Sequence, residues 1–269
     1  MSKIYDALKQ AQREKIESWS SGPQPSAKSI AAPGRETGCG RAFSSVDTAL
    51  EKAMNRLYQG IESRLPDCPR KVVQFMGSRK GEGVSTIVHD FGLIMAANLG
   101  KPVLILDADR LEPVQHLLFG LAPESGWDGL LSGNSPFGDG AGGGESSCGG
   151  IDKVLHQVDG TDLYVCPASP KGTIARHVFD PVKMDSLLKQ LRTRFDLVIV
   201  DSPPAESSPD GLAMARSADG VVLVLGAETT RWPVAMSTKE AIEKSGGNIL
   251  GSVFDKHRYH IPEFIYKRL

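Results

Sequence analysis

The chain has 269 residues, 40% of them hydrophobic, and a formal net charge of −1. This length allows one sizeable core, and the balanced charge argues against nucleic-acid binding through bulk electrostatics. No apolar run approaches the roughly 18–20 residues of a membrane span, and the N-terminus lacks an apolar signal core. The cysteines show no spacing typical of metal sites or disulfides; they are Cys39, Cys68, Cys148 and Cys166. We therefore expect a soluble, cytoplasmic protein.

The N-terminal segment, residues 1–18, has apolar residues at helical spacing. Ile4, Leu8 and Ala11 lie on one face of an amphipathic helix over residues 3–18. That helix either docks on its own domain or serves as a hook for a partner. Residues 19–45 are rich in Ser, Gly and Pro, which is typical of a flexible linker.

From residue 46 onward, helix and strand patterns alternate. Helices are expected at 46–63, 85–98, 127–131, 181–194, 211–217 and 232–245. Strands are expected at 72–76, 101–106, 163–166, 195–200, 221–225 and 249–254. The repeated unit predicts a three-layer α/β domain over residues 46–256, with a doubly wound, mostly parallel sheet. The glycine-rich segment 133–150 is expected to be a mobile surface insertion, and residues 257–269 form a C-terminal tail.

A glycine-bearing loop follows the first strand and reads Ser78-Arg-Lys-Gly-Glu-Gly-Val-Ser-Thr86. Backbone N–H groups at such a helix N-terminus favour bound phosphate. Glycines permit the turns of the loop, and the hydroxyls of Ser85 and Thr86 fall where they would meet Mg²⁺ and phosphate. Val84 stands where a lysine is usual, so the side-chain charge toward the β- and γ-phosphates is missing. The pattern predicts a P-loop NTPase-like fold.

Three carboxylates follow strands of the predicted sheet. Asp107 and Asp109 follow one strand, and Asp201 follows another. Because ligands of such sheets bind beyond the carboxyl ends of the strands, we expect these side chains to converge on the loop. Asp201 would hold Mg²⁺ directly or through water. One of the other two would share the Mg²⁺ shell while its neighbour positions a nucleophile. The alternatives are a turn cap for Asp201 and a solvated turn for the pair.

Together these residues resemble a known family. The loop Ser78–Thr86, the segment Leu104-Ile-Leu-Asp-Ala-Asp109 and the segment Val198-Ile-Val-Asp-Ser-Pro-Pro204 are similar to the three nucleotide motifs of bacterial tyrosine kinases. That family acts in capsular and exopolysaccharide synthesis and falls within the deviant P-loop (MinD/ParA-like) ATPases. The resemblance covers nearly the whole chain outside the linkers, including the opening Met-Ser-Lys-Ile-Tyr-Asp-Ala-Leu.

The resemblance implies ATP and Mg²⁺ as cofactors and tyrosine autophosphorylation in the C-terminal tail. Tyr259 and Tyr266 are the candidate acceptors there, with packing or partner contact as the alternative. It further implies a membrane polysaccharide chain-length determinant or co-polymerase as partner, a homo-oligomer, and recruitment to the inner face of the membrane. No nucleic-acid partner is expected.

The resemblance also assigns roles by position. The metal would be held by Ser85, Asp107 and Asp201. The catalytic residues would be Asp107, Asp109, Arg79 and Lys80. The nucleotide would be bound by Ser78, Gly81, Glu82, Gly83, Val84, Ser85, Thr86 and Asp255.

Several positions depart from the family pattern. Arg79 occupies the position of the deviant-loop signature lysine, and Lys80 replaces the kinases' usual proline. Asp255 stands where an asparagine helps to read adenine, and Glu51 is not followed by the arginines of the family's assembly motif.

Loss of the loop lysine bears most directly on activity. Removing one positioned transition-state donor typically costs roughly 3–4 kcal/mol, or about 100- to 1000-fold in rate. We therefore expect nucleotide binding with weak or no kinase activity unless Arg79 or Lys80 substitutes. Three interpretations stay open: a tyrosine autokinase with an unusual phosphate clamp, a pseudokinase-like binding or scaffold subunit, and a positioning ATPase.

Overall fold

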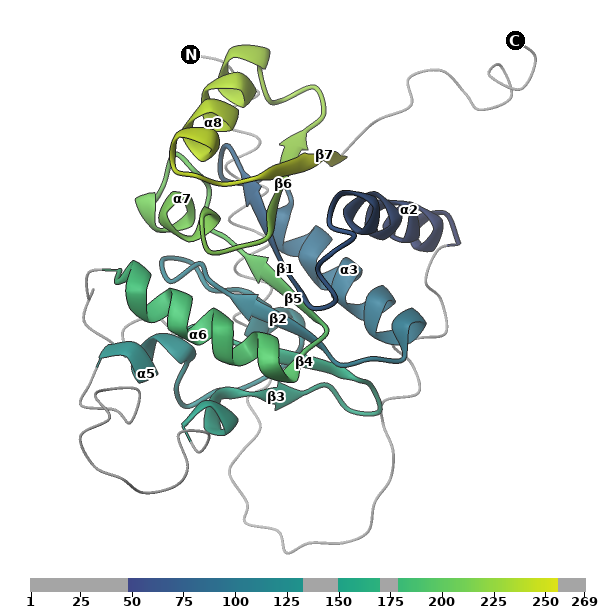
Figure 1. Ribbon diagram of the computed structural model, residues 1–269, viewed down its shortest axis with the longest axis vertical. Coiled ribbons are helices and arrows are strands. Elements are labelled where there is room, and N and C mark those ends of the chain that lie inside the picture. Colours follow the sequence, from purple (N-terminus) through teal and green to yellow (C-terminus); the bar gives the residue numbers. More distant parts are fainter. Residues whose placement is uncertain (1–47, 133–149, 170–178, 256–269) are drawn as a thin grey trace, which may run out of the picture. The chain divides into compact units, whose positions relative to one another are not determined.

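The computed structural model describes residues 48–132, 150–169 and 179–255 (Figure 1). The predicted N-terminal helix and linker, most of the glycine-rich segment 133–150 and the C-terminal tail lie outside these residues. So do Tyr259 and Tyr266, and their predicted roles stay predictions.

The described residues form a seven-stranded sheet in the order β3-β4-β2-β5-β1-β6-β7. All neighbouring strands are parallel except β3, which is antiparallel to β4. The strands are β1 Lys71–Gly77, β2 Val103–Asp107, β3 His156–Gln157, β4 Leu163–Cys166, β5 Leu197–Asp201, β6 Gly220–Gly226 and β7 Ile249–Asp255.

Helices cover both faces of this sheet, so the predicted doubly wound fold is confirmed (Figure 1). Helices α2 and α3 lie on one face, and α6, α7 and α8 on the other. The helices are α2 Thr48–Arg64, α3 Val84–Leu99, α4 Gln115–Leu118, α5 Trp127–Ser132, α6 Pro181–Arg194, α7 Pro209–Ala215 and α8 Trp232–Lys244, with a 3₁₀ turn at Ile151–Val154. Sequence reasoning missed β3, α4 and this turn, since each is too short to show a period.

The central strands are buried on both faces, which explains their unbroken apolar runs. In β1, Val73 and Phe75 pack with α3 on one face, and the Phe75 ring lies 5.4 Å from the Phe91 ring. Val72 of the same strand packs with α6 on the opposite face. This alternation follows from the period of two of a strand.

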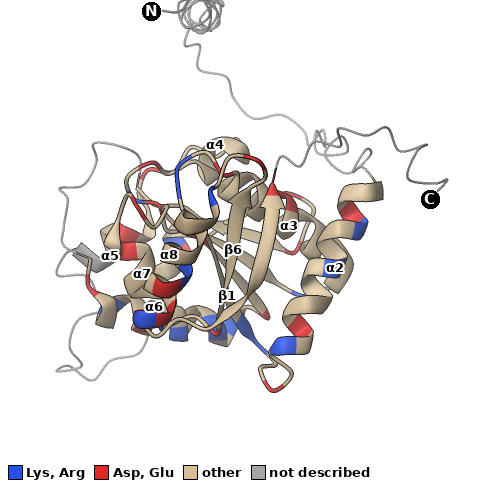
Figure 2. Cartoon of the chain, turned by 90° about the horizontal axis from the view of Figure 1, so that it is seen from above, with Lys and Arg blue, Asp and Glu red and all other residues tan. Residues whose placement is uncertain are grey.

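Charge is distributed with both signs along the surface helices. Figure 2 shows acidic and basic residues together on α2 and α6. Helix α6 begins at Pro181, and the carboxylate of Asp180 accepts hydrogen bonds from the N–H groups of Val182 and Lys183. No helix among the described residues is both long and apolar enough to span a membrane.

The sheet brings the motif residues to one edge. β1 lies between β5 and β6, and β2 lies beyond β5. Asp107 of β2 is in register with Asp201 of β5, and Phe75 of β1 is paired with Asp201 on the other side. The loop after β1 and both carboxylates therefore leave the same carboxyl edge, as the sequence predicted.

Candidate functional site

The loop between β1 and α3 needs its two glycines. Gly81 has φ 89° and Gly83 has φ 85°, in the left-handed region that favours glycine. A Cβ atom at Gly83 would also collide with the carboxylate of Asp255 at the end of β7. Helix α3 begins directly after this residue, at Val84. The loop therefore delivers main-chain N–H groups to the N-terminus of a 16-residue helix, the usual place for an anion.

Glu82 braces this loop. Its Oε2 accepts hydrogen bonds from the backbone N–H groups of Ser78, at 2.5 Å, and Arg79, at 3.0 Å. Its Oε1 accepts a hydrogen bond from the hydroxyl of Thr230, in the connection between β6 and α8. Both carboxylate oxygens of this buried side chain are hydrogen-bonded within the protein. Glu82 therefore holds the loop in its conformation and would affect a bound ligand only indirectly.

A cavity of about 300 Å³ opens beside the loop. Residues 79–86 form one wall, and the turn after β2 and the segment after β5 form the other. The facing walls contribute Asp109, Leu111, Glu112, Val114, Ser202, Pro204 and Ser207. Val84 lines the cavity but is only 8% exposed, because its side chain packs into the core beneath the loop. At the position where the resemblance leads one to expect a lysine, the chain thus has a buried apolar side chain.

The two basic loop residues lie at the mouth of the cavity and pair with acidic residues opposite. Arg79 Nε lies 3.3 Å from Glu206 Oε2, and Lys80 forms an ion pair with Glu112. The side chains of Arg79 and Lys80 are 53% and 70% exposed. Exposed pairs of this kind contribute about 0–1 kcal/mol. Either cation can therefore exchange its partner for an anionic ligand at little cost.

Asp107 is engaged by backbone groups. Its Oδ2 accepts hydrogen bonds from the N–H groups of Val114, at 3.0 Å, and Gln115, at 2.9 Å, which lie at the start of α4. Burial raises the pKa of Asp107 well above its ordinary value, and the neighbouring charge of Asp201 adds to the rise. Asp107 thus fixes the short helix α4 against the end of β2 and does not line the cavity.

Asp201 is 1% exposed, and its carboxylate is hydrogen-bonded to the side chain of Ser85. Its Oδ2 accepts a hydrogen bond from Gln115 Nε2 at 2.7 Å. Burial raises the pKa of Asp201 to about 6, and the Gln115 amide and Ser85 hydroxyl oppose the rise. Its Oδ1 is buried without a hydrogen-bond partner among the described residues.

A magnesium–nucleotide complex fits these residues better than a bare metal ion does. The described part of the chain contains no group of three or more His, Cys, Asp or Glu side chains arranged to hold a metal. The unpartnered Asp201 oxygen and the Ser85 hydroxyl supply oxygen atoms, which Mg²⁺ prefers, and Mg²⁺ in nucleotide sites takes its other ligands from phosphate and water. The donor set is therefore suited to an ion that arrives with a nucleotide.

The remaining predicted residues lie in different places. Asp109 lines the cavity, and its Oδ1 accepts hydrogen bonds from the N–H groups of Leu111 and Glu112, each at 3.0 Å. Asp255 lies against Gly83 and is not among the residues that line the cavity. The structure thus brings the loop and Asp109 around one cavity, with Asp201 and Asp107 buried behind it.

Sequence reasoning missed Gln115, which connects the two buried carboxylates. Its backbone N–H donates to Asp107 and its side chain to Asp201. It lies in a segment without periodicity, where a glutamine is ordinarily a surface residue. Gln115 lies eight residues after Asp107, and this spacing by itself does not predict a contact between them.

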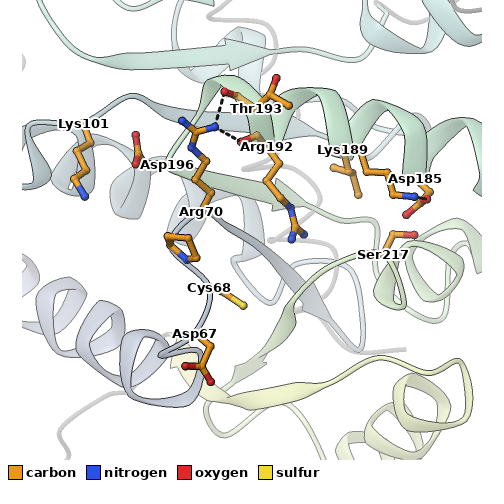
Figure 3. A pocket seen from close by; sticks show the side chains of 12 residues that line it. Asp67, Cys68, Arg70, Lys101, Asp185, Lys189, Arg192, Thr193, Asp196 and Ser217 are labelled. Carbon is orange, nitrogen blue, oxygen red and sulfur yellow. Dashed lines mark hydrogen bonds and ion pairs between the residues drawn. The ribbon is translucent and has the colours of Figure 1, made fainter.

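A larger cavity, of about 750 Å³, lies at the opposite edge of the sheet (Figure 3). Arg70, Lys101 and Asp196, which lie one or two residues before β1, β2 and β5, are among its lining residues. Arg70 donates hydrogen bonds to the carbonyls of Arg192 and Thr193 at the end of α6, as Figure 3 shows. The charges that line this cavity are mixed in sign, and Lys189 is paired with Asp185. A cavity of this kind at the amino ends of the strands does not indicate a nucleotide site.

No family model matches the chain. The chain is 26% identical over 187 residues to the tyrosine-protein kinase CpsD of Streptococcus agalactiae, which covers 69% of this chain and 75% of CpsD. Its structure is similar to the kinase domain of the Escherichia coli tyrosine kinase ETK, with a TM-score of 0.61, 20% identity and 79% of each chain covered.

The cell division ATPase MinD of Pyrococcus furiosus is also similar in structure. The TM-score is 0.57 and the identity 21%, with 74% of this chain and 78% of MinD covered. At these identities the structural likeness concerns the fold. The sequence relatives and the fold together confirm the resemblance of this chain to the bacterial tyrosine kinases and, beyond them, to the MinD-like P-loop ATPases.

Proposed function

We propose that the chain is a tyrosine-autokinase-like P-loop protein that binds ATP with Mg²⁺ and regulates the polymerisation or export of an exopolysaccharide or capsule. The observation that carries the proposal is the braced glycine loop at the N-terminus of α3, with Ser85 in its first turn and Asp201 buried behind it. The name of the relative CpsD, a tyrosine-protein kinase, supports the reaction class.

Each residue of the site has a task in this proposal. The N–H groups of the loop, with Thr86, hold the phosphates, and Ser85 and Asp201 hold Mg²⁺. When bound, Mg²⁺ neutralises charge on the phosphates. Asp109 lies in the cavity wall, from which a carboxylate can orient and deprotonate an incoming hydroxyl. Asp107 contributes by holding α4 in place.

Arg79 is the proposed replacement for the missing lysine. It occupies the signature position of the deviant loop, and its weak, exposed pair with Glu206 leaves the guanidinium ready to bind phosphate. Lys80 is the second candidate because its pair with Glu112 crosses the same mouth. Either would restore part of the roughly 3–4 kcal/mol that a positioned donor contributes to the transition state.

A catalytically weak, pseudokinase-like subunit is the second candidate function. Two observations favour it: the buried valine beneath the loop, and the carboxylate of Asp255 against Gly83, where its charge repels phosphate. In that case the nucleotide state, or the fold alone, would act on a partner. A positioning ATPase is the third candidate, favoured by the structural similarity to MinD.

The proposed partner is a membrane polysaccharide chain-length determinant or co-polymerase, which recruits a cytoplasmic protein to the inner face of the membrane. A homo-oligomer is proposed with it, and Tyr259 and Tyr266 are the proposed phosphate acceptors.

Transfer of isotope from ATP to the purified protein tests the proposal. We expect wild type to be labelled, Asp201→Ala to be unlabelled, and Arg79→Ala to lose about 100-fold or more. Lys80→Ala should lose much less, and the double variant Tyr259→Phe with Tyr266→Phe should lose its acceptor. Restoring the lysine with Val84→Lys should increase labelling.

The other outcomes separate the candidates. Labelling that survives both basic substitutions and disappears only in Asp201→Ala shows that neither cation replaces the lysine. Binding of a fluorescent ATP analogue without transfer supports the pseudokinase-like subunit, and hydrolysis with nucleotide-dependent dimerisation supports the positioning ATPase. No binding at all, with or without Mg²⁺, overturns the proposal.

A further inference from the structure

Gln115 joins four elements at the candidate site. It is the first residue of α4 and is fully buried. Its backbone N–H donates to Asp107 at the end of β2, at 2.9 Å. Its side-chain Nε2 donates to Asp201 Oδ2 at the end of β5, at 2.7 Å, and to the backbone carbonyl of Ser85 in α3, at 3.0 Å. One glutamine thus contacts both residues that we propose as metal ligands.

The orientation of this amide follows from its partners. A carboxylate oxygen and a backbone carbonyl are both acceptors, so the NH₂ group must face them and the amide oxygen must face away. That oxygen, Oε1, is buried without a hydrogen-bond partner among the described residues, and so is Oδ1 of Asp201. Buried polar atoms in native proteins are nearly always paired. The unpaired Asp201 Oδ1 is available to a cation, and Gln115 is the side chain that fixes the other oxygen of the same carboxylate.

We propose that Gln115 is a positioning residue for the metal–nucleotide site. Its amide fixes the carboxylate of Asp201 relative to the first turn of α3, so that Asp201 and Ser85 would be held in position to bind an Mg²⁺ ion that arrives with a nucleotide. Partners that orient metal ligands typically change metal affinity by about 10- to 100-fold when they are replaced. The inference rests on the proposed nucleotide site and adds a residue that acts through Asp201 and Ser85.

Gln74 provides a matched control for a purely structural role. It is also fully buried, its Nε2 also donates two hydrogen bonds, and its Oε1 also lacks a partner among the residues described. The acceptors of Gln74 are Ser202 Oγ, at 2.5 Å, and the carbonyl of Gly211, at 2.8 Å, and neither is a proposed metal ligand. Replacing either glutamine with methionine removes two Nε2 hydrogen bonds at nearly constant volume, and only for Gln115 is one of the two acceptors a carboxylate.

The experiment measures the affinity of a fluorescent ATP analogue in Mg²⁺ and in EDTA, with wild type, Gln115→Met and Gln74→Met. In wild type, Mg²⁺ should tighten binding. In Gln115→Met this enhancement should fall by about 10- to 100-fold, while the affinity in EDTA stays within about twofold, since the loop amides are untouched. Gln74→Met should keep the enhancement. Thermal unfolding monitors folding, and Gln115→Leu replaces the methionine variant if that variant does not fold.

A double-mutant cycle with Asp201→Asn tests the route of the effect. If Gln115 acts through Asp201, its replacement should change the Mg²⁺ enhancement much less in the Asp201→Asn background than in wild type. Equal losses in Gln115→Met and Gln74→Met, or a full enhancement in both, overturn the inference and leave the proposed function standing. A wild-type protein that binds no nucleotide in either condition overturns the proposed function, and the inference with it.

Discussion

At the scale of single residues, two carboxylates face a low-dielectric interior. Asp107 and Asp201 are paired in register on adjacent strands, and both are buried. Asp107 has backbone N–H partners, whereas one oxygen of Asp201 has no partner among the described residues. Two buried carboxylates without a cation lower the stability of the folded protein, and a bound cation would remove this cost. Such an arrangement is typical of a binding site.

The raised pKa of Asp201 predicts a pH-dependent stability. Because its pKa is about 6 in the folded protein and 3.8 ordinarily, the folded state binds this proton more tightly than the unfolded state. The corresponding stability is fully present below about pH 4 and is lost as the pH rises through about 6. The difference corresponds to about 3 kcal/mol. Asp201→Asn should therefore raise the free energy of unfolding by up to about that amount at pH 8, without Mg²⁺, and hardly at all at pH 4.

Urea denaturation at both pH values measures this effect. Asp185→Asn is the control, because the hydrogen-bonded ion pair of that half-exposed residue with Lys189 lowers the pKa of Asp185. Its contribution has the opposite sign and is present above the unfolded pKa, so its replacement should not stabilise the protein at pH 8. An equal gain from Asp201→Asn at pH 4 and pH 8 would contradict the assignment.

The sequence revealed some site residues and concealed others. Gly81, Gly83, Ser85 and Asp201 were predicted because each belongs to a short pattern with a physical reason. Gln115 was missed, since a buried polar residue becomes recognisable only once its partners are in place. The brace by Glu82 likewise depends on Thr230, which is 148 residues away.

At the scale of elements, the junction of the loop with α3 is set by backbone geometry and by a contact with β7. Both Gly81 and Gly83 have positive φ, but only Gly83 lies against another element. A Cβ at Gly81 would meet nothing within 4 Å, whereas one at Gly83 would collide with Asp255. The two positions therefore separate backbone strain from steric conflict.

This difference predicts unequal effects of alanine. Gly81→Ala should destabilise by about 1–2 kcal/mol, the cost of a left-handed conformation for a residue with a Cβ. Gly83→Ala should cost at least about 1 kcal/mol more, since contact with Asp255 is added. In an Asp255→Ala background, Gly83→Ala should lose that excess and retain the backbone term. Chemical denaturation of the four variants measures the cycle, and equal costs at both glycines would show that the Asp255 contact is absent.

The short helix α4 shows why some elements escape prediction. It has four residues, fewer than are needed to reveal a helical period. Its place is set by the carboxylate of Asp107, while the indole N–H of Trp127 donates to the backbone carbonyl of that same aspartate at 2.7 Å. These contacts join residues 7, 8 and 20 positions apart, beyond the spacing of a helical or strand period, so a search for periodicity does not find them.

At the scale of the whole described domain, the two edges of the sheet differ. The carboxyl edge carries the loop, the carboxylates and the smaller cavity, and the amino edge carries the larger cavity of mixed charge. Cavity volume would select the amino edge. Strand direction and chemistry select the carboxyl edge, because main-chain N–H groups and the helix N-terminus gather there.

Substitution at the amino edge tests this distinction. Arg70→Ala removes the hydrogen bonds to the carbonyls of Arg192 and Thr193 and should lower the free energy of unfolding by about 1 kcal/mol. Nucleotide affinity should stay within about twofold of wild type. Titration of the fluorescent ATP analogue measures the affinity, with Asp201→Ala as the variant expected to weaken it in Mg²⁺. A large loss of nucleotide affinity in Arg70→Ala would instead place the nucleotide site at the amino edge of the sheet.

The sequence by itself determined the fold class, the alternation of strands and helices, and the position of the glycine loop before a helix, because these depend on local periodicity and on glycine and hydroxyl positions within a few residues. Only the tertiary structure decided that Asp107 is held by α4, that Glu82 braces the loop through Thr230, and that Gln115 ties both carboxylates to α3. The physical reason is that hydrogen bonding and desolvation of buried groups depend on which distant segments pack together, and the register of a seven-stranded sheet sets that only after folding.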